Sequence, residues 1–151
     1  MENTYTILVL HGPNLNLLGE RDPKFYGSFT LDEINRRLEM LGEDFGIKVR
    51  AIQANSEGAL IDHLQQARHW ARGVVFNPGG YSHSSISLRD AVSSINIPVV
   101  EVHLSNIQAR EEFRRQSMVA PACLGSIYGF GWHSYALGLL ALVRKFSEED
   151  E

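Results

Sequence analysis

The chain has 151 residues and a mass of 16.9 kDa; 44% of its residues are hydrophobic and 21% are charged. This balance fits one folded domain over residues 1–151 and excludes a disordered, collagen-like or disulfide-built protein. The net charge of −4 comes entirely from the acidic end, residues 148–151, which we expect to be solvated and disordered. The neutral remainder lacks the basic excess of a nucleic-acid-binding protein.

The sequence predicts neither an export signal nor a membrane span. The apolar run at 5–10 is too short for a signal-peptide core, and no basic region precedes it. Residues 116–143 carry no Asp, Glu, Lys or Arg, but glycines, serines and Pro121 interrupt them, so we expect a buried strand followed by a buried helix. The single cysteine, Cys123, cannot form an internal disulfide, and a cytoplasmic location without membrane partners is expected.

Apolar runs and amphipathic segments alternate along the chain. The runs predict strands at 5–10, 47–53, 73–77, 98–103 and 123–129. The amphipathic segments predict helices at 30–45, 57–72, 83–95, 106–116 and 132–146. Capping boxes mark two helix starts, Thr30 with Glu33 and Ser105 with Gln108.

Five such units predict an α/β fold, a flavodoxin-like three-layer sandwich. Its five-stranded parallel sheet should have the order 2-1-3-4-5. The connection over residues 11–29 is longer than the usual limit of about 12–15 residues. Because Gly12, Gly19 and Gly27 give it places to bend, we expect it to act as a lid.

Ligands bind to such sheets beyond the carboxyl ends of the strands, where the strand order switches. Polar and glycine residues gather there in three segments: 11–14 (HGPN), 77–83 (NPGGYSH) and 101–105 (EVHLS). Each segment alone could be turn chemistry. Their convergence on one edge of the sheet predicts a site.

Glu101 and His103 lie two residues apart on one predicted strand, so their side chains share a face. A carboxylate beside an imidazole favours the imidazolium and orients the ring, which suits a general acid. The alternative is a strand-end histidine with a purely structural role.

Arg21 and Tyr26 both lie in the expected lid. A free tyrosine has a pKa of about 10, and a neighbouring guanidinium lowers it, so a tyrosinate could act as a base near neutral pH. Packing of Tyr26 on the surface is the alternative.

The expected helix at 106–116 offers further candidates. The free N–H groups of Leu104 and Ser105 at its start suit a carboxylate, although Ser105 could simply cap the helix. Arg110 and Arg114 would share one face, where they could hold substrate oxygens or pair with Glu111.

Motifs for other chemistries are absent. The sequence has no GxxxxGK[ST], HExxH or CxxC motif, and no lysine closes an apolar strand as a Schiff-base residue would. Two alternatives remain: a flavin- or phosphate-binding module of the same fold, and a metal hydrolase that uses His83, His103 and Glu101.

Four segments carry a family resemblance: GPNLNLLGERDPKFYGSFTL (12–31), QANSEGALID (53–62), NPGGYSHSSISLRDA (77–91) and PVVEVHLSNIQAREEFRRQS (98–117). In this order and spacing they resemble the type II 3-dehydroquinate dehydratases, also called type II dehydroquinases. The resemblance implies a single catalytic domain with the flavodoxin-like fold. It also implies a cofactor-free and metal-free lyase that reversibly dehydrates 3-dehydroquinate to 3-dehydroshikimate in the shikimate pathway, by anti elimination through an enolate.

The resemblance also implies roles for individual residues. Tyr26 matches the proton-abstracting tyrosine, and Arg21 matches the arginine that activates it. Asn14 matches the asparagine that positions a water at the enolate. His103 matches the acid that protonates the departing hydroxyl, with Glu101 orienting it.

The remaining matches concern binding and assembly. The implied substrate contacts are Asn77, His83, Arg114 and the N–H groups of Leu104 and Ser105. Asp90 matches an aspartate that reaches into the site of a neighbouring subunit, and Arg110 matches an arginine near the lid. The family forms a homododecamer of four trimers, which we expect here. Position 11 is His11, where asparagine also occurs in the family.

Overall fold

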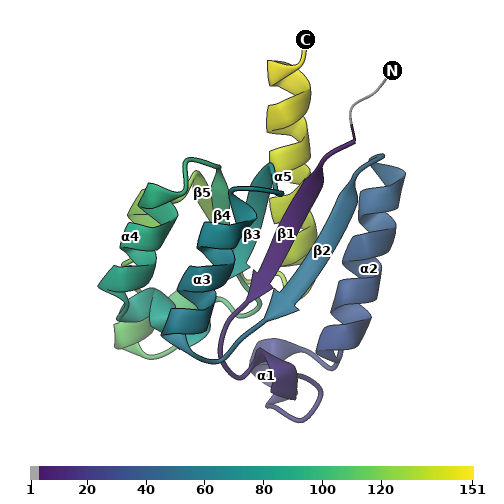
Figure 1. Cartoon of the computed structure of the whole chain (residues 1–151). Helices are drawn as coiled ribbons and strands as arrows, with labels where there is room; N and C mark the ends of the chain where they lie inside the picture. The colour runs from purple at the N-terminus through teal and green to yellow at the C-terminus, as the bar shows by residue number, and fades with distance from the viewer. Residues whose placement is uncertain (1–3) are drawn as a thin grey trace.

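The computed structural model describes residues 4–151 as a three-layer sandwich around one parallel sheet (Figure 1). The strands are β1 (Thr6–His11), β2 (Lys48–Gln53), β3 (Gly73–Asn77), β4 (Val99–His103) and β5 (Gly125–Tyr128). All four pairings are parallel and the order is β2-β1-β3-β4-β5, so the predicted fold and strand order are confirmed.

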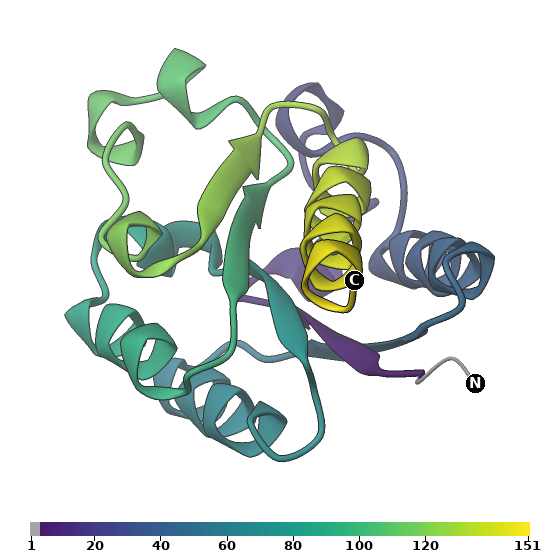
Figure 2. The same cartoon turned by 90° about the horizontal axis from the view of Figure 1, so that it is seen from above.

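Two helices cover each face of the sheet. Helices α2 (Leu31–Asp44) and α5 (His133–Glu149) pack on one face; α3 (Glu57–Ala67) and α4 (Ile86–Ser94) pack on the other, as Figure 2 shows from above. Ile7 and Val9 of β1 face the α2 and α5 layer, while Leu8 and Leu10 face the α3 and α4 layer. This alternation follows from the two-residue period of a strand, and it buries all four side chains.

The same period sets the direction of the polar side chains at the strand ends. His11 and Asn77 are opposite one another in the β1–β3 ladder, and both are in phase with residues that face α5. Glu101 and His103 are in phase with Val99, which faces the α3 and α4 layer. The carboxyl edge of the sheet therefore carries polar groups on both of its faces.

Several helix boundaries follow local capping chemistry. The Thr30 hydroxyl accepts a hydrogen bond from the Glu33 N–H at 3.2 Å, as the capping box predicts. Ser85 accepts from the Leu88 N–H at 2.9 Å, so α4 begins at Ile86, later than the predicted residue 83. Residues 79–83 form a 3₁₀ turn instead. Helix α3 ends at Ala67, short of the predicted residue 72.

The expected helix at 106–116 is wrong. The segment instead forms two 3₁₀ turns, Ile107–Ala109 and Glu112–Arg114, and Asn106 rather than Ser105 caps the first. The cause lies just beyond, where Met118 donates a backbone hydrogen bond of 2.6 Å to the Ser82 carbonyl. A straight helix would carry the chain away from this partner, so tertiary hydrogen bonding outweighs the helical pattern.

Two further segments are more ordered than the sequence suggests. The connection over residues 11–29 contains a 3₁₀ turn, Leu15–Leu17, and a short helix α1 (Pro23–Tyr26), which Asp22 caps. We expected residues 148–151 to be disordered, but α5 continues to Glu149, and Arg72 binds both carboxylate oxygens of Asp150 at 2.8 and 3.0 Å.

Within residues 4–151, no helix is long and apolar enough to cross a membrane.

Candidate active site

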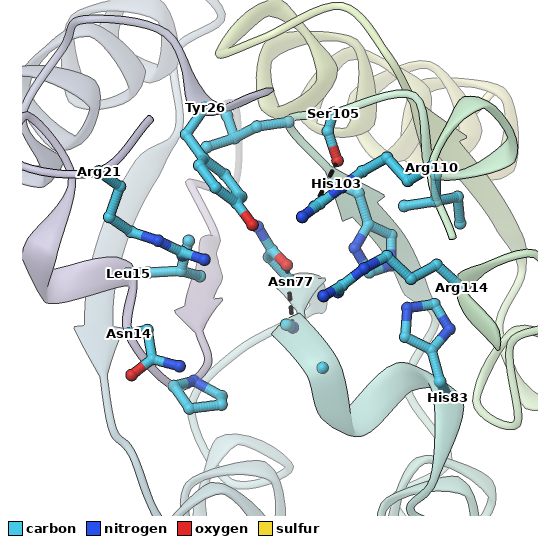
Figure 3. A pocket seen from close by; sticks show the side chains of 15 residues that line it. Asn14, Leu15, Arg21, Tyr26, Asn77, His83, His103, Ser105, Arg110 and Arg114 are labelled. Carbon is cyan, nitrogen blue, oxygen red and sulfur yellow. Dashed lines mark hydrogen bonds between the residues drawn. The ribbon is translucent and has the colours of Figure 1, made fainter. Parts of the chain in front are cut away.

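A cavity of about 640 Å³, its open mouth included, lies beyond the carboxyl ends of β1, β3 and β4 (Figure 3). Three guanidinium groups and two imidazoles line it, whereas its lining includes no Asp or Glu. The lining residues that we predicted from the sequence are Asn14, Arg21, Tyr26, Asn77, His83, His103, Leu104, Ser105, Arg110 and Arg114. The excess of positive charge makes the cavity suited to an anionic ligand.

Tyr26 and Arg21 meet at one wall of this cavity. Tyr26 is the last residue of α1, and its hydroxyl points into the cavity (Figure 3). The Arg21 guanidinium carbon lies 3.7 Å from the centre of the Tyr26 ring, and that of Arg110 lies 5.2 Å from it. Two guanidinium groups therefore lie beside one phenol ring. The position inside the cavity speaks against a tyrosine that only packs on the surface.

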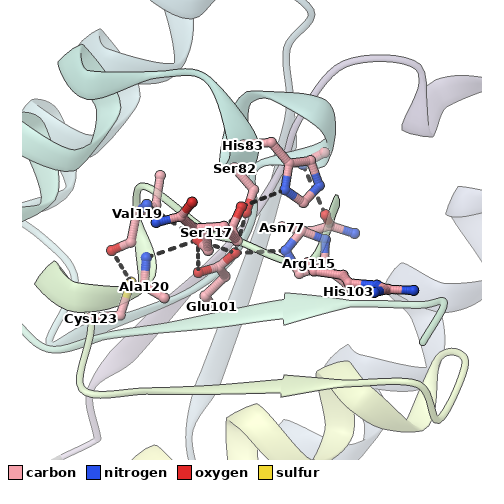
Figure 4. A network of polar contacts seen from close by, with 12 residues as sticks. Asn77, Ser82, His83, Glu101, His103, Arg115, Ser117, Val119, Ala120 and Cys123 are labelled. Carbon is pink, nitrogen blue, oxygen red and sulfur yellow. Dashed lines mark hydrogen bonds and ion pairs between the residues drawn. The ribbon is translucent and has the colours of Figure 1, made fainter. Parts of the chain in front are cut away.

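Glu101 lies almost fully buried behind the opposite wall and holds His103 (Figure 4). The Oε2 atom of Glu101 lies 2.6 Å from His103 Nε2 and also accepts a hydrogen bond of 2.6 Å from the Ser82 hydroxyl. The Ser117 hydroxyl is 2.8 Å from Oε1. Burial opposes ionisation of Glu101, but these hydrogen bonds outweigh it and hold the pKa of the carboxyl below its usual value.

Sequence reasoning missed the two serines of this network. Ser82 is buried, and Ser117 accepts backbone N–H bonds from Val119 and Ala120 while it donates to Glu101. Ser117 lies sixteen residues beyond Glu101, and only the fold brings the two together. The polar segment after β3 was the one signal that could have indicated Ser82.

His83 stands beside His103, with ring centres 6.2 Å apart and the rings nearly parallel. Its Nδ1 lies 2.9 Å from the Gln116 carbonyl, so Nδ1–H donates and Nε2 remains an acceptor. Burial lowers the pKa of His83, and the charges of His103 and Arg114 lower it further. A neutral His83 is suited to accept a hydrogen bond from a hydroxyl group.

Arg110, which follows the first 3₁₀ turn, and Arg114, which ends the second, both reach the cavity, but not from one helix face (Figure 3). Arg114 donates to Glu111 at 3.0 Å, so it makes the surface pair and lines the cavity as well. Arg110 donates to the Ser105 hydroxyl at 3.3 Å, and its buried Nε has no hydrogen-bond partner within residues 4–151. Leu104 and Ser105 precede the turn and do not open a helix.

The floor of the cavity depends on a close approach of two loops. Gly12 donates its N–H to the Asn77 carbonyl at 2.7 Å, and a Cβ at Gly12 would lie 2.7 Å from backbone atoms of Pro78. Glycine is therefore required there. Asn14 follows in the left-handed region, with φ of 69°, and its backbone N–H donates to Asn55.

Two further points from the sequence concern Asp90, expected to act in the site of a neighbouring subunit, and the metal-hydrolase alternative. Asp90 is exposed on α4 and does not line it, so a single chain gives Asp90 no contact with a ligand there. Across residues 4–151, no group of three or more His, Cys, Asp or Glu side chains is arranged to hold a metal ion. The described residues therefore contain no set of side chains that could serve as metal ligands for the metal-hydrolase alternative.

His11, completely buried beside the cavity floor, makes the stability of the fold depend on pH. Its pKa is lowered to about 4 by burial, against an ordinary value of about 6.5. Between these pH values His11 becomes protonated in the unfolded chain but stays neutral in the folded chain. The free energy of unfolding should therefore fall by ~3 kcal/mol as the pH drops from about 6.5 to 4, and level off below.

This expectation is checked by denaturant unfolding of the native chain and of His11→Asn at several pH values. The native chain should lose more stability than the variant across this interval, because the variant has no imidazole to protonate. Parallel curves for the two proteins would contradict the assignment.

Comparisons with known proteins agree over nearly the whole chain. The family model described as "Dehydroquinase class II" matches residues 5–143. The chain is 55% identical over 139 residues to the 3-dehydroquinate dehydratase of Trichodesmium erythraeum (strain IMS101), covering 92% of this chain and 93% of the relative. The crystal structure of type II dehydroquinase from Propionibacterium acnes is similar with a TM-score of 0.90 at 41% identity, over 95% of this chain and 99% of that one. That of the Butyrivibrio crossotus DSM 2876 enzyme also has a TM-score of 0.90, at 38% identity, over 93% and 98%.

Proposed function

The chain belongs to the class II dehydroquinase family, and from this membership we propose that it catalyses the reversible dehydration of 3-dehydroquinate to 3-dehydroshikimate in the shikimate pathway. The observation that carries the proposal is the cavity in which Tyr26 and His103 face one space with three arginines and no carboxylate in the lining. A hydroxylated carboxylic acid needs such positive charge, and its dehydration needs both a base and an acid.

In the proposed first step Tyr26 acts as the base. Its phenolate oxygen takes the proton from the carbon next to the ketone, and the electrons of that C–H bond form an enolate. The Arg21 guanidinium, 3.7 Å from the ring centre, stabilises the phenolate before transfer. Asn14 would hold a water that donates to the enolate oxygen.

In the second step the enolate collapses and breaks the C–O bond to the departing hydroxyl. His103 supplies a proton to that oxygen, so that water leaves. Glu101 holds Nε2 of the ring at 2.6 Å, which leaves Nδ1 to serve the substrate. Glu101, which also accepts hydrogen bonds from Ser82 and Ser117, would hold the ring in position for this transfer.

The remaining polar groups are proposed to hold the substrate. Arg114, His83 and Asn77 lie where hydroxyl groups could reach them, and the backbone N–H groups of Leu104 and Ser105 would bind the carboxylate. With every catalytic group supplied by the chain itself, the proposed reaction needs no metal or cofactor.

A direct assay tests the function. 3-Dehydroquinate is added to protein treated exhaustively with a chelator, and the ultraviolet absorbance of the conjugated enone product is followed. We expect turnover that survives chelation and disappears when the protein is heat-denatured. Absence of enone formation by folded protein would contradict the proposed function.

We also propose that the chain assembles as a homododecamer of four trimers, in which Asp90 from one subunit completes the site of another. Asp90→Ala should then raise KM several-fold or reduce the assembly size, because Asp90 is exposed and its side chain makes no ion pair within residues 4–151, which leaves it available to a neighbouring subunit. Light scattering and steady-state kinetics check this. An unchanged mass together with an unchanged KM would contradict the role across subunits.

A further inference from the structure

A row of buried polar side chains runs from the cavity floor to the outer helix layer. Asn77 Nδ2 lies 3.0 Å from the Tyr135 hydroxyl, which lies 2.8 Å from His11 Nδ1. His11 Nε2 in turn lies 2.7 Å from the Oδ1 atom of Asn35. Asn77, Tyr135 and His11 are each at most 3% exposed, so water does not substitute for these contacts. The row joins β3, α5, β1 and α2.

Chemistry fixes the direction of every hydrogen bond in this row. A buried, neutral His11 has one donor and one acceptor nitrogen, and the carbonyl oxygen of Asn35 requires Nε2 to be the donor. Nδ1 is therefore an acceptor, and the Tyr135 hydroxyl donates to it. The Tyr135 oxygen then accepts the hydrogen bond from Asn77 Nδ2. Burial raises the pKa of Tyr135, so its hydroxyl keeps the proton that the row needs.

The row determines which way the Asn77 amide points. Asn77 Oδ1 accepts from the Gly79 N–H at 3.0 Å, and Nδ2 donates to Tyr135. A flipped amide would place its NH₂ group against the Gly79 N–H. It would also turn Oδ1 toward the Tyr135 hydroxyl, which would then have to donate to Asn77 and lose its hydrogen bond to His11. One N–H and one oxygen lone pair of Asn77 are thereby left for the cavity, at fixed positions (Figure 3).

We propose that Tyr135 and His11 are positioning residues that lock the Asn77 amide in the orientation in which it binds a hydroxyl group of the substrate. This inference rests on the proposed function, because it concerns the same cavity. It assigns a role in substrate binding to two side chains that do not line the cavity themselves. A purely structural role for Tyr135, joining α5 to the sheet, is the competing explanation.

A double-mutant cycle separates the two explanations. The kcat/KM for 3-dehydroquinate is measured for the native chain, Tyr135→Phe, Asn77→Ala and the double variant, each first shown to be folded by denaturant unfolding. Tyr135→Phe should lower kcat/KM about tenfold in the native background, as expected for loss of one oriented hydrogen bond. In the Asn77→Ala background, Tyr135→Phe should change kcat/KM by less than twofold. An equal loss in both backgrounds, or no loss in the native background, would overturn the proposal.

Tyr5→Phe is the matched control. Tyr5 packs edge-on against Phe146, away from the cavity, and its hydroxyl makes no hydrogen bond within residues 4–151. We expect its kcat/KM to equal that of the native chain. If the native chain itself fails to form the enone, the proposed function fails; a fully active native chain with an unaffected Tyr135→Phe overturns only this inference.

If Tyr135→Phe does not fold, a second pair of variants, both at His11, tests the same row of hydrogen bonds. His11→Asn keeps a side-chain oxygen that can accept from Tyr135, whereas His11→Leu removes the acceptor at a similar volume. We expect kcat/KM within twofold of native for His11→Asn and about tenfold lower for His11→Leu. The same kcat/KM in both variants would overturn the proposal.

Discussion

Replacing Tyr26 with phenylalanine should lower kcat by roughly 10²–10⁴-fold, the factor that a positioned general base typically contributes. The change removes only the oxygen that would take the proton. The ring stays, so its contacts with Arg21 and Phe25 are kept. Because Tyr26 is only half-buried, we expect the free energy of unfolding to change by less than about 0.5 kcal/mol.

The control is Tyr128→Phe on β5, a half-buried tyrosine that does not line the cavity. It should leave kcat unchanged. Steady-state enone formation measures both variants, and denaturant unfolding measures their stability. If Tyr26→Phe turns over as fast as the native chain, Tyr26 is not the base.

The location of this site could be predicted from the sequence because it depends on topology. Apolar runs that alternate with amphipathic helices predict a parallel sheet, and a parallel sheet places the ends of β1, β3 and β4 on one edge. The pairing of Glu101 with His103 also follows from the strand period alone. For Arg21 and Tyr26, membership in one lid segment was sufficient to suggest proximity.

Features that depend on contacts between distant segments could not be predicted in this way. The segment around Arg110 and Arg114 has a helical pattern but forms two 3₁₀ turns, and just beyond it Met118 bonds to the turn after β3. The order at the acidic end depends on the pairing of Arg72 with Asp150, which are far apart in the sequence. Likewise, nothing in the sequence places Tyr135 between His11 and Asn77.

The two walls of the cavity differ in how rigidly they hold their groups. Glu101 is fixed by three side chains and is almost fully buried, so the orientation of His103 is set before a substrate arrives. Tyr26 and Arg21 lie on a short helix and its flanking turn, and they are only half-buried. We therefore expect any closing movement to come from residues 11–29, which would bring the base to a prepared acid.

Replacing His103 with glutamine should also lower the rate of dehydration by roughly 10²–10⁴-fold, because the departing hydroxyl loses its proton donor. In a reaction through an enolate, however, proton abstraction precedes loss of the hydroxyl. His103→Gln should therefore still exchange the substrate proton next to the ketone with deuterium from D₂O, since Tyr26 and Arg21 are intact. Tyr26→Phe should lose the exchange and the dehydration together.

Mass spectrometry of recovered 3-dehydroquinate measures the exchange, and enone absorbance measures the dehydration. The glutamine side chain can still donate a hydrogen bond to Glu101, so the buried carboxylate keeps a partner in this variant. If His103→Gln loses exchange as completely as dehydration, the two bonds break in one step and the enolate route is wrong. Retained exchange with lost dehydration would instead assign the base to one wall of the cavity and the acid to the other.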